Sequence, residues 1–557
     1  MIRELTPQVL AFSMLLVISA SSILSLLISA LVLVTYRHRV LDAMAQPAGD
    51  TPACEQNDTQ LASRTTHLVL QPSPCPAGSA LYGQVLRATR RDAWRTAVAG
   101  LAFALVIAIA AGLALAQLQT PVRFALSLWV CSWPTMLALA LTTPLEPRLR
   151  AIGFAAYFAL FPVGILVSEV TAQWSGSTGI DYLYTTTPLE MFVRWLAANG
   201  PPTAFLMLFV NRRVRAVGPL LLGFSTAMTS SFLAAYLLLM TPNGWQWLEL
   251  AAKAAGMPTP VALLLLAILA LLVSTVLGWF LLNWIKRAYL RKQLNDRSLT
   301  LDALWLLFAS WYGMALTLAS LAWVLAGALG FAAYKLAKAW ACRRFGRDTL
   351  PLQPRELAFL RVFSLGARSD RLFEAITRYW RHIGSVDLIT GPDVAHSTLQ
   401  PHQLLDFLVG RLARHFITDA NTLDTRMRQR DMAPDRDCRF RVNNFFCHAD
   451  TWESALPRLV KGGDVVLMDL RSFSGHNAGC VHELQHLVSF IPLRHCVFAI
   501  DDSTDQVFLQ RTLDSAWQVM PVHSPNRSMI PSEVNYHHLG RGGKSVRELL
   551  RRLCDAA

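Results

Sequence analysis

The sequence predicts a two-part chain: a polytopic α-helical membrane region followed by an α/β domain with a mainly parallel sheet. The 557 residues are 53% hydrophobic and only 16% charged, which is too apolar for a soluble protein of this size. Apolar runs of roughly 18 residues or more, long enough to cross a bilayer, recur up to about residue 340. Beyond that point, short apolar segments alternate with amphipathic ones, which is typical of strands connected by helices.

The membrane region, residues 1–340, is expected to contain about nine spans. Hydropathy places them at Val9–Tyr36, Ala97–Leu118, Phe124–Leu141, Ile152–Ala172, Met191–Val210, Val217–Met240 and Val261–Trp284, with a last apolar block at Leu301–Tyr334. That block is longer than one span needs, and both of its flanks are basic. Two short helices turning near Thr317–Ser320 satisfy both flanks, and one long tilted helix is the alternative.

Arginine and lysine gather in alternate loops, one of which is the long loop 37–95. The positive-inside rule then predicts a multi-pass protein of a bacterial inner membrane, with its N-terminus outside and both loop 37–95 and the C-terminal domain in the cytoplasm. The net charge of +14 belongs mainly to these loops. We therefore expect the lipid bilayer as a partner and no nucleic acid. His67–Leu70 has the pattern of a short strand, and Trp129 and Trp133 fit interfacial anchors.

The α/β domain is expected at 350–525, followed by a basic C-terminal tail at 526–557. Predicted strands are Leu357–Leu365, Val386–Thr390, Phe440–Cys447, Val465–Leu470 and His495–Ile500; predicted helices are Arg371–Ile383, Pro401–Phe416, Thr451–Val460, Asn477–Phe490 and Thr504–Val519. Buried strands between helices indicate a flavodoxin-like or Rossmann-like doubly wound sheet, whose ligand crevice lies at the carboxyl ends of the strands. No G-x-G-x-x-G follows the first strand, and Thr418–Asp437 reads as a polar loop.

One stretch of this domain carries the most chemistry. The strand Val465–Leu470 leads into a loop with Ser472 and Ser474, and a helix with the order Cys480-Val481-His482-Glu483-Leu484 follows. This arrangement resembles the third strand and third helix of TIR (Toll/interleukin-1 receptor) domains. The resemblance is specific here and vague elsewhere, and Gly479 stands where that family has an aromatic residue.

The resemblance implies a signalling or defence protein whose TIR-like domain self-associates, so a homo-oligomer is expected. In catalytic members of that family the corresponding glutamate serves NAD cleavage, which would make Glu483 catalytic, Ser472 and Ser474 substrate contacts, and NAD the substrate. A carboxylate suits this reaction because it stabilises the positive charge that develops on the ribose. Many members are scaffolds without activity, and Glu483 can equally serve as an acid in the first helical turn. A non-catalytic scaffold or transporter-like protein therefore remains the alternative.

The same helix also contains the pattern H-E-x-x-H, with His482 and His486 one turn apart. On a helix two such histidines face the same way and can hold zinc, while Glu483 activates a bound water. A zinc metalloprotease is thus a second alternative. No third ligand has a recognisable spacing, so a zinc cofactor is expected only under this alternative.

Overall fold

In the computed structural model the chain forms two compact units, and each is described by itself. The helical unit comprises Met1–Leu33, Ala93–Arg343 and Gln400–Leu405, and the α/β unit comprises Val34–Asp92, Arg344–Leu399 and Asp406–Ala557. The structure describes residues 27, 30–46, 68–72, 79–114, 121–144, 146–160, 188–210, 218, 220–226, 241–317, 319–345, 351, 353–362, 367–390, 401–448, 450–527, 533–540 and 542–557.

Among the described residues, four helices are long and apolar enough to cross a membrane. They are Ala80–Ala114 (α2), Phe124–Thr142 (formed by α3, Pro121–Cys131, and α4, Trp133–Thr142), Thr259–Leu290 (α10) and Asp296–Leu316 (α11). They agree with four of the predicted spans. The predicted spans Val9–Tyr36, Ile152–Ala172 and Val217–Met240 lie partly outside the described residues.

The last apolar block is a helical hairpin, as the sequence predicts. Helix α11 ends at Leu316, and α12 (Leu325–Phe345) begins after a 3₁₀ turn. The two helices approach closely at a pair of glycines: a Cβ on Gly327 would lie 2.2 Å from the Ala309 carbonyl oxygen. Small residues permit such backbone contact between membrane helices. The single long helix is therefore wrong.

Helix α7 (Pro188–Val210) runs through Pro201 and Pro202 without a break. The buried Asn199 accepts a hydrogen bond from Tyr312 Oη at 2.6 Å and donates one to the Val130 carbonyl oxygen at 3.2 Å. These two hydrogen bonds replace the contacts with water that the Asn199 side chain lacks inside the helical unit.

Two tryptophans that the sequence assigns to the membrane interface make their polar contacts within the helical unit. Trp133 is buried and donates its indole N–H to Thr203 Oγ1 at 2.8 Å. Trp129 donates to the Tyr157 carbonyl oxygen at 2.9 Å and stacks on the Tyr157 ring. Hydropathy could not reveal this, because a tryptophan whose N–H finds a partner is as stable inside the bundle as at its rim.

The α/β unit is built on one eight-stranded sheet in which every strand pair is parallel. The strands are β1 (Val69–Pro72), β2 (Leu357–Arg361), β3 (Val386–Thr390), β4 (Phe416–Ile417), β5 (Val442–Cys447), β6 (Val465–Asp469), β7 (Cys496–Ile500) and β8 (Glu533–His538). The spatial order is β1-β8-β7-β6-β2-β3-β5-β4. Six of the strands match sequence predictions: β2, β3, β5, β6 and β7 read as short apolar runs, and β1 overlaps the predicted strand His67–Leu70.

This order decides between the two doubly wound alternatives. Successive strands β2, β3 and β5 run outward in one direction, and β6, β7 and β8 run outward in the other. Without the two edge strands this is the Rossmann order 3-2-1-4-5-6 and not the flavodoxin order 2-1-3-4-5. The direction in which successive strands are added to the sheet reverses between β2 and β6, so the ligand crevice is expected at the carboxyl ends of these two strands.

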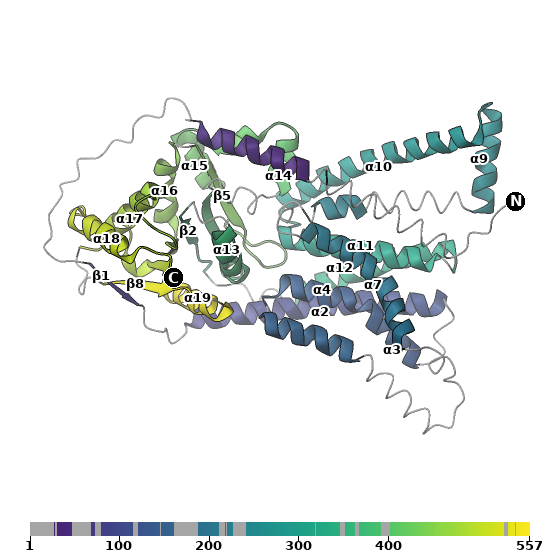
Figure 1. Ribbon diagram of the computed structural model, residues 1–557, viewed down its shortest axis with the longest axis horizontal. Helices are drawn as coiled ribbons and strands as arrows, with labels where there is room; N and C mark the ends of the chain where they lie inside the picture. The colour runs from purple at the N-terminus through teal and green to yellow at the C-terminus, as the bar shows by residue number, and fades with distance from the viewer. Residues whose placement is uncertain are drawn as a thin grey trace, which may run out of the picture. The chain divides into compact units, whose positions relative to one another are not determined.

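Helices cover both faces of the sheet (Figure 1). One face packs against α16 (Trp452–Gly462), α17 (Ala478–Phe490) and α18 (Gln506–Gln518), and the other against α13 (Ala367–Trp380) and α19 (Gly543–Ala556). Strand β8 and helix α19 lie in the segment that the sequence assigns to a basic tail. Leu549, Leu550 and Leu553 of α19 are fully buried on the sheet. Because α19 is rich in basic residues, its composition alone does not reveal that one face of the helix is apolar.

The Thr418–Asp437 segment is not a plain loop, because it contains α15 (Ala420–Arg428). Asp419 and Thr422 begin that helix with a reciprocal capping box, which stabilises a short polar helix. The helix predicted at Pro401–Phe416 ends earlier, at Leu408 (α14), and its last residue becomes part of strand β4.

Residues 34–92, here called the strap, belong to the α/β unit. More than two hundred residues of the chain separate the strap from the rest of that unit. Near the start of the strap, the Ala43 carbonyl oxygen lies 2.7 Å from His448 Nδ1, just past β5. Later, β1 pairs with β8 at the opposite side of the sheet. Tyr82 and Val85, in the first turns of α2, are buried with α13 and α19. The predicted cytoplasmic loop therefore contributes a strand and part of a core.

Candidate functional site

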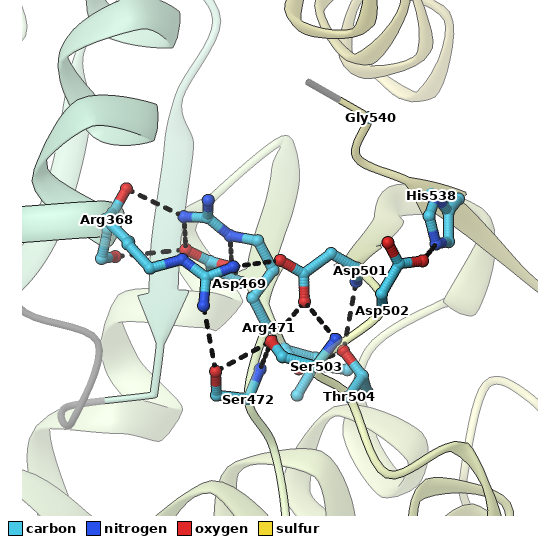
Figure 2. Close-up of polar contacts among 12 residues, drawn as sticks. Arg368, Asp469, Arg471, Ser472, Asp501, Asp502, Ser503, Thr504, His538 and Gly540 are labelled. Atoms are coloured by element: carbon cyan, nitrogen blue, oxygen red, sulfur yellow. Dashed lines mark hydrogen bonds and ion pairs between the residues drawn. The ribbon is translucent and has the colours of Figure 1, made fainter. Parts of the chain in front are cut away.

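The candidate site lies at the carboxyl ends of β6, β7 and β8, beside the first turn of α13 (Figure 2). Strands β6 and β8 end in a polar residue, Asp501 follows β7 directly, and the loops carry further polar groups. In a parallel sheet all carboxyl ends meet at one edge, which brings together residues that are distant in sequence. The members are Arg368, Asp469, Arg471, Ser472, Asp501, Asp502, Ser503, Thr504 and His538.

A buried ion pair forms the base of the site. The Asp469 carboxylate, which has no exposed surface, accepts hydrogen bonds from Arg471 Nε at 2.7 Å and Nη2 at 2.6 Å. Ser369 Oγ donates a further bond to it at 3.2 Å, and Arg471 Nη2 also donates to the Arg368 carbonyl oxygen at 3.1 Å. Such a two-pronged pair is geometrically rigid. It fixes the first turn of α13 to the end of β6.

The outer part of the site is a chain of polar groups that begins at Arg368. The Arg368 guanidinium pairs with the Asp501 carboxylate and donates to Ser472 Oγ at 3.4 Å. The Ser472 and Ser503 hydroxyl oxygens lie 2.9 Å apart, and Ser503 Oγ donates to Asp501 Oδ1 at 2.5 Å. The Arg368 side chain is 44% exposed, whereas that of Asp501 is 13% exposed. A guanidinium and two hydroxyls therefore converge at an accessible place.

Ser472 has a left-handed backbone, with φ of +57°. Residues other than glycine rarely adopt this conformation, which costs of order 1 kcal/mol or more and occurs preferentially at functional sites. Three hydrogen bonds hold the residue there: the Ser472 N–H donates to Ser503 Oγ at 3.1 Å, and its hydroxyl contacts Ser503 and Arg368. The surroundings thus impose the position of this hydroxyl.

The ends of β6, β7 and β8 are tied to one another. Thr504 Oγ1 donates to the Leu470 carbonyl oxygen at 3.0 Å and accepts the Asp501 N–H at 3.2 Å, which connects β6 to β7. His538, the last residue of β8, lies 3.0 Å from Asp502 through its Nε2 atom. Asp502 is almost fully exposed, so this pair forms the solvent-facing end of the site.

Glu483, the predicted catalytic residue, is inside the domain and not at its rim. It is 1% exposed, and its Oε2 atom has no hydrogen-bond partner among the described residues. Burial raises the pKa of Glu483 to about 8, although the positive charge of Arg361 and a hydrogen bond with Cys480 act in the opposite direction. The carboxyl group is therefore protonated at neutral pH.

The two predicted substrate-contact serines have different surroundings. Ser472 belongs to the polar chain described above. Ser474 donates its N–H to Asn477 Oδ1 at 2.9 Å and its hydroxyl to the same atom at 3.3 Å. Asn477 is the residue before α17, so Ser474 orders the start of that helix.

Within the described ranges, no third metal ligand accompanies the two histidines of the H-E-x-x-H pattern. His482 is exposed and contacts the edge of the Trp452 ring, and His486 packs against Phe490. Burial, together with the charge of His482, lowers the pKa of His486 to about 4. In the described part of the chain, no three His, Cys, Asp or Glu side chains are grouped to hold a metal ion. A catalytic zinc needs three protein ligands, so these residues do not fit one.

Most of the site was not found from the sequence, although one signal was present. Asp469 and Asp501 each come at the end of an apolar strand, where parallel strands of one sheet place their ligand-binding residues. Arg368 gave no local signal, because its role depends on α13 starting beside β6. Comparison of the chain with protein-family models, curated proteins and solved structures found no significant match.

Proposed function

We propose that this chain is an integral membrane signalling protein whose Rossmann-type domain binds a nucleotide of the NAD class at the carboxyl edge of the sheet. The observation that carries the proposal is the convergence of Arg368, Ser472 and Ser503 next to the point where the strand order reverses. Ligands of doubly wound sheets bind at that point. Guanidinium and hydroxyl groups are suitable donors to phosphate oxygens.

The start of α13 adds to this chemistry. Arg368 lies in its first turn, where backbone N–H groups and the helix dipole favour an anion. The ion pair between Arg368 and Asp501 occupies the guanidinium in the free protein. A bound phosphate would compete with Asp501 for it, so binding would rearrange the link between α13 and β7. A rearrangement of this kind is what a signalling domain needs.

NAD cleavage is the second candidate function. The protonation and burial of Glu483 bear on whether this residue can serve that reaction. A carboxyl with a pKa near 8 is of the kind found in catalytic acids. Stabilising a positive ribose, however, requires an ionised carboxylate that reaches the substrate, and Glu483 is neutral at pH 7 and enclosed. Binding without turnover is therefore the reading that the geometry favours.

The membrane part of the proposal follows from the apolar helices and the basic loops. The domain would face the cytoplasm of a bacterial inner membrane, with the chain's N-terminus outside, and a defence role would be one form of the signalling. Self-association of the α/β unit would produce the response, so the partner is a second copy of the chain.

The test is NAD binding by the full chain in lipid nanodiscs, measured by calorimetry. We expect Arg368→Ala to weaken binding at least about tenfold, since a hydrogen bond to a charged group contributes roughly 1.5–3 kcal/mol. Arg378→Ala, at the other end of α13, is the matched control and should bind as the unaltered protein does. Absence of binding of NAD, ATP and ADP at millimolar concentrations would refute the proposal. NAD turnover that is lost in Glu483→Gln would establish the second candidate instead.

A further inference from the structure

The edge of β8 is covered by a strand from a distant part of the chain. Residues Val69, Leu70, Gln71 and Pro72 pair in parallel with Glu533 to Tyr536. The segment is inserted between β8 and helix α18, more than four hundred positions away in sequence, as the separation of 446 between Leu68 and Asp514 shows. The β8 edge is therefore an accepting surface for a strand.

Side chains of α18 hold this segment in place. The Leu68 N–H donates to Asp514 Oδ1 at 3.0 Å, and the Leu70 N–H donates to Gln510 Oε1 at 3.3 Å. Gln510 Nε2 donates in turn to the Leu68 carbonyl oxygen. The accepting surface thus recognises backbone groups and packs against Leu68, which is fully buried, and Leu70, which is half-buried.

Strand β1 is held less firmly than the central strands. All five residues of β2, β3, β6 and β7 are buried, whereas Leu70 is half-buried and Gln71 and Pro72 are exposed. Segments with little buried apolar surface open locally at a lower free energy than the rest of a fold. When β1 leaves, the N–H and C=O groups of β8 become an unpaired sheet edge.

We propose that the β8 edge is a self-association surface: residues 68–72 of the same chain close it, and on their release the same segment of a second copy takes their place. A surface that accepts a segment within one chain accepts the identical segment of another, which is the basis of strand exchange in oligomers. The inference rests on the self-association part of the proposed function, and it does not depend on a ligand.

The first experiment measures the oligomeric state of the full chain in nanodiscs and in detergent by mass photometry. The double variant Gln510→Ala/Asp514→Ala removes both side-chain anchors, which hold the strand in the closed and in the exchanged state alike, so it should speed the exchange between monomer and oligomer at least about threefold. Gln518→Ala, an exposed residue of the same helix, is the control and should leave the exchange rate unchanged. Leu70→Cys/Val534→Cys joins two residues that are paired in register, and its oxidised form should stay monomeric while its reduced form does not. Since both forms are the same protein, misfolding cannot imitate this difference.

The second experiment detects the exchanged strand. Chains with Leu70→Cys alone are mixed with chains carrying Val534→Cys alone, in the Gln510→Ala/Asp514→Ala background, and oxidised. A disulfide-linked dimer that is absent when unaltered chains are mixed supports strand exchange. Oligomers that form without this cross-link refute the inference and leave self-association intact. If neither oligomers nor the cross-link form, the inference and the self-association part of the proposed function both fail.

Discussion

The two edges of the parallel sheet are both rich in charge, but they use it differently. At the amino edge, Arg430 Nη1 donates to both Glu356 and Asp387 at 2.9 Å, and Asn443 donates to Asp387 at 2.8 Å. These groups join β2, β3 and β5 to the segment before β5. At the carboxyl edge the buried pair of Asp469 and Arg471 supports an outer layer that remains accessible.

The two edges differ in how many polar groups remain accessible once the ion pairs and hydrogen bonds have formed. At the amino edge the two acids that Arg430 binds are largely covered: the Glu356 side chain is 20% exposed and that of Asp387 is 2% exposed. At the carboxyl edge, Arg368 is 44% exposed and Ser472 is held at a positive φ. Enclosed pairs stabilise a fold, whereas exposed groups in imposed positions bind. We therefore expect substitutions at the amino edge to affect stability, and those in the outer layer to affect binding.

The largest expected effect is that of Asp387→Ala at the amino edge. Removing this 1% exposed carboxylate deprives Arg430 and Asn443 of a partner and should lower the free energy of unfolding by about 3 kcal/mol. Urea denaturation of the full chain in detergent, followed by tryptophan fluorescence, measures this change.

A matched control is Asp424→Ala. Asp424 pairs with Arg458 at 2.9 Å, but about half of its side chain is exposed. Exposed pairs contribute less than about 1 kcal/mol. If Asp387→Ala were no more harmful than Asp424→Ala, the amino edge would not have the stabilising role assigned to it.

An intermediate effect is expected for Glu483→Gln, and it should depend on pH. The folded-state pKa of Glu483 is raised from 4.5 to about 8, so the folded protein keeps a proton that the unfolded chain has already lost. Stability therefore falls as pH rises through this window. Glutamine removes that loss: we expect no gain at pH 4.5, and a gain of about 1.4 kcal/mol or more at pH 8, the equivalent of at least one pKa unit. Melting curves of both proteins across this range would show a constant difference if the carboxyl were instead ionised in the fold.

The smallest effect is expected at Ser472, where two substitutions separate the hydroxyl from the backbone. Both Ser472→Gly and Ser472→Ala remove the hydroxyl and should weaken NAD binding alike. Only glycine relieves the positive φ, so Ser472→Gly should be more stable than Ser472→Ala by about 1 kcal/mol. Equal stability of the two variants, measured by thermal unfolding, would remove strain from the description of the carboxyl edge.

The sequence predicts the parts of the fold that depend on local patterns. Strands such as Val465–Asp469 are short apolar runs, and helices such as α18 show a clear amphipathic period, so both were found. The sequence does not determine the order of the strands in the sheet, because neither the spacing of apolar residues nor the length of a strand indicates which strands are neighbours. The hairpin of α11 and α12 was found because the charge of its flanks is a local signal.

The site was predicted only in part, for a reason that its residues make clear. Ser472 was found through a local motif, and it does lie in the polar network. Arg368 and Asp501 are 133 positions apart and meet only once the sheet has formed. Glu483 was found by the same motif as Ser472, but no local pattern reveals that α17 turns its carboxyl toward the core.

The position of β1 also determines the order in which the protein can fold during its synthesis. Residues 68–72 leave the ribosome before their partner β8 is made, because β8 lies more than four hundred residues further along the chain. Until then the segment has no sheet to join, and contacts that span so much chain form slowly because closing a long loop costs entropy. The β8 edge is thus filled last, and a chain that stops before residue 533 leaves its own amino-terminal strand without a place in the fold.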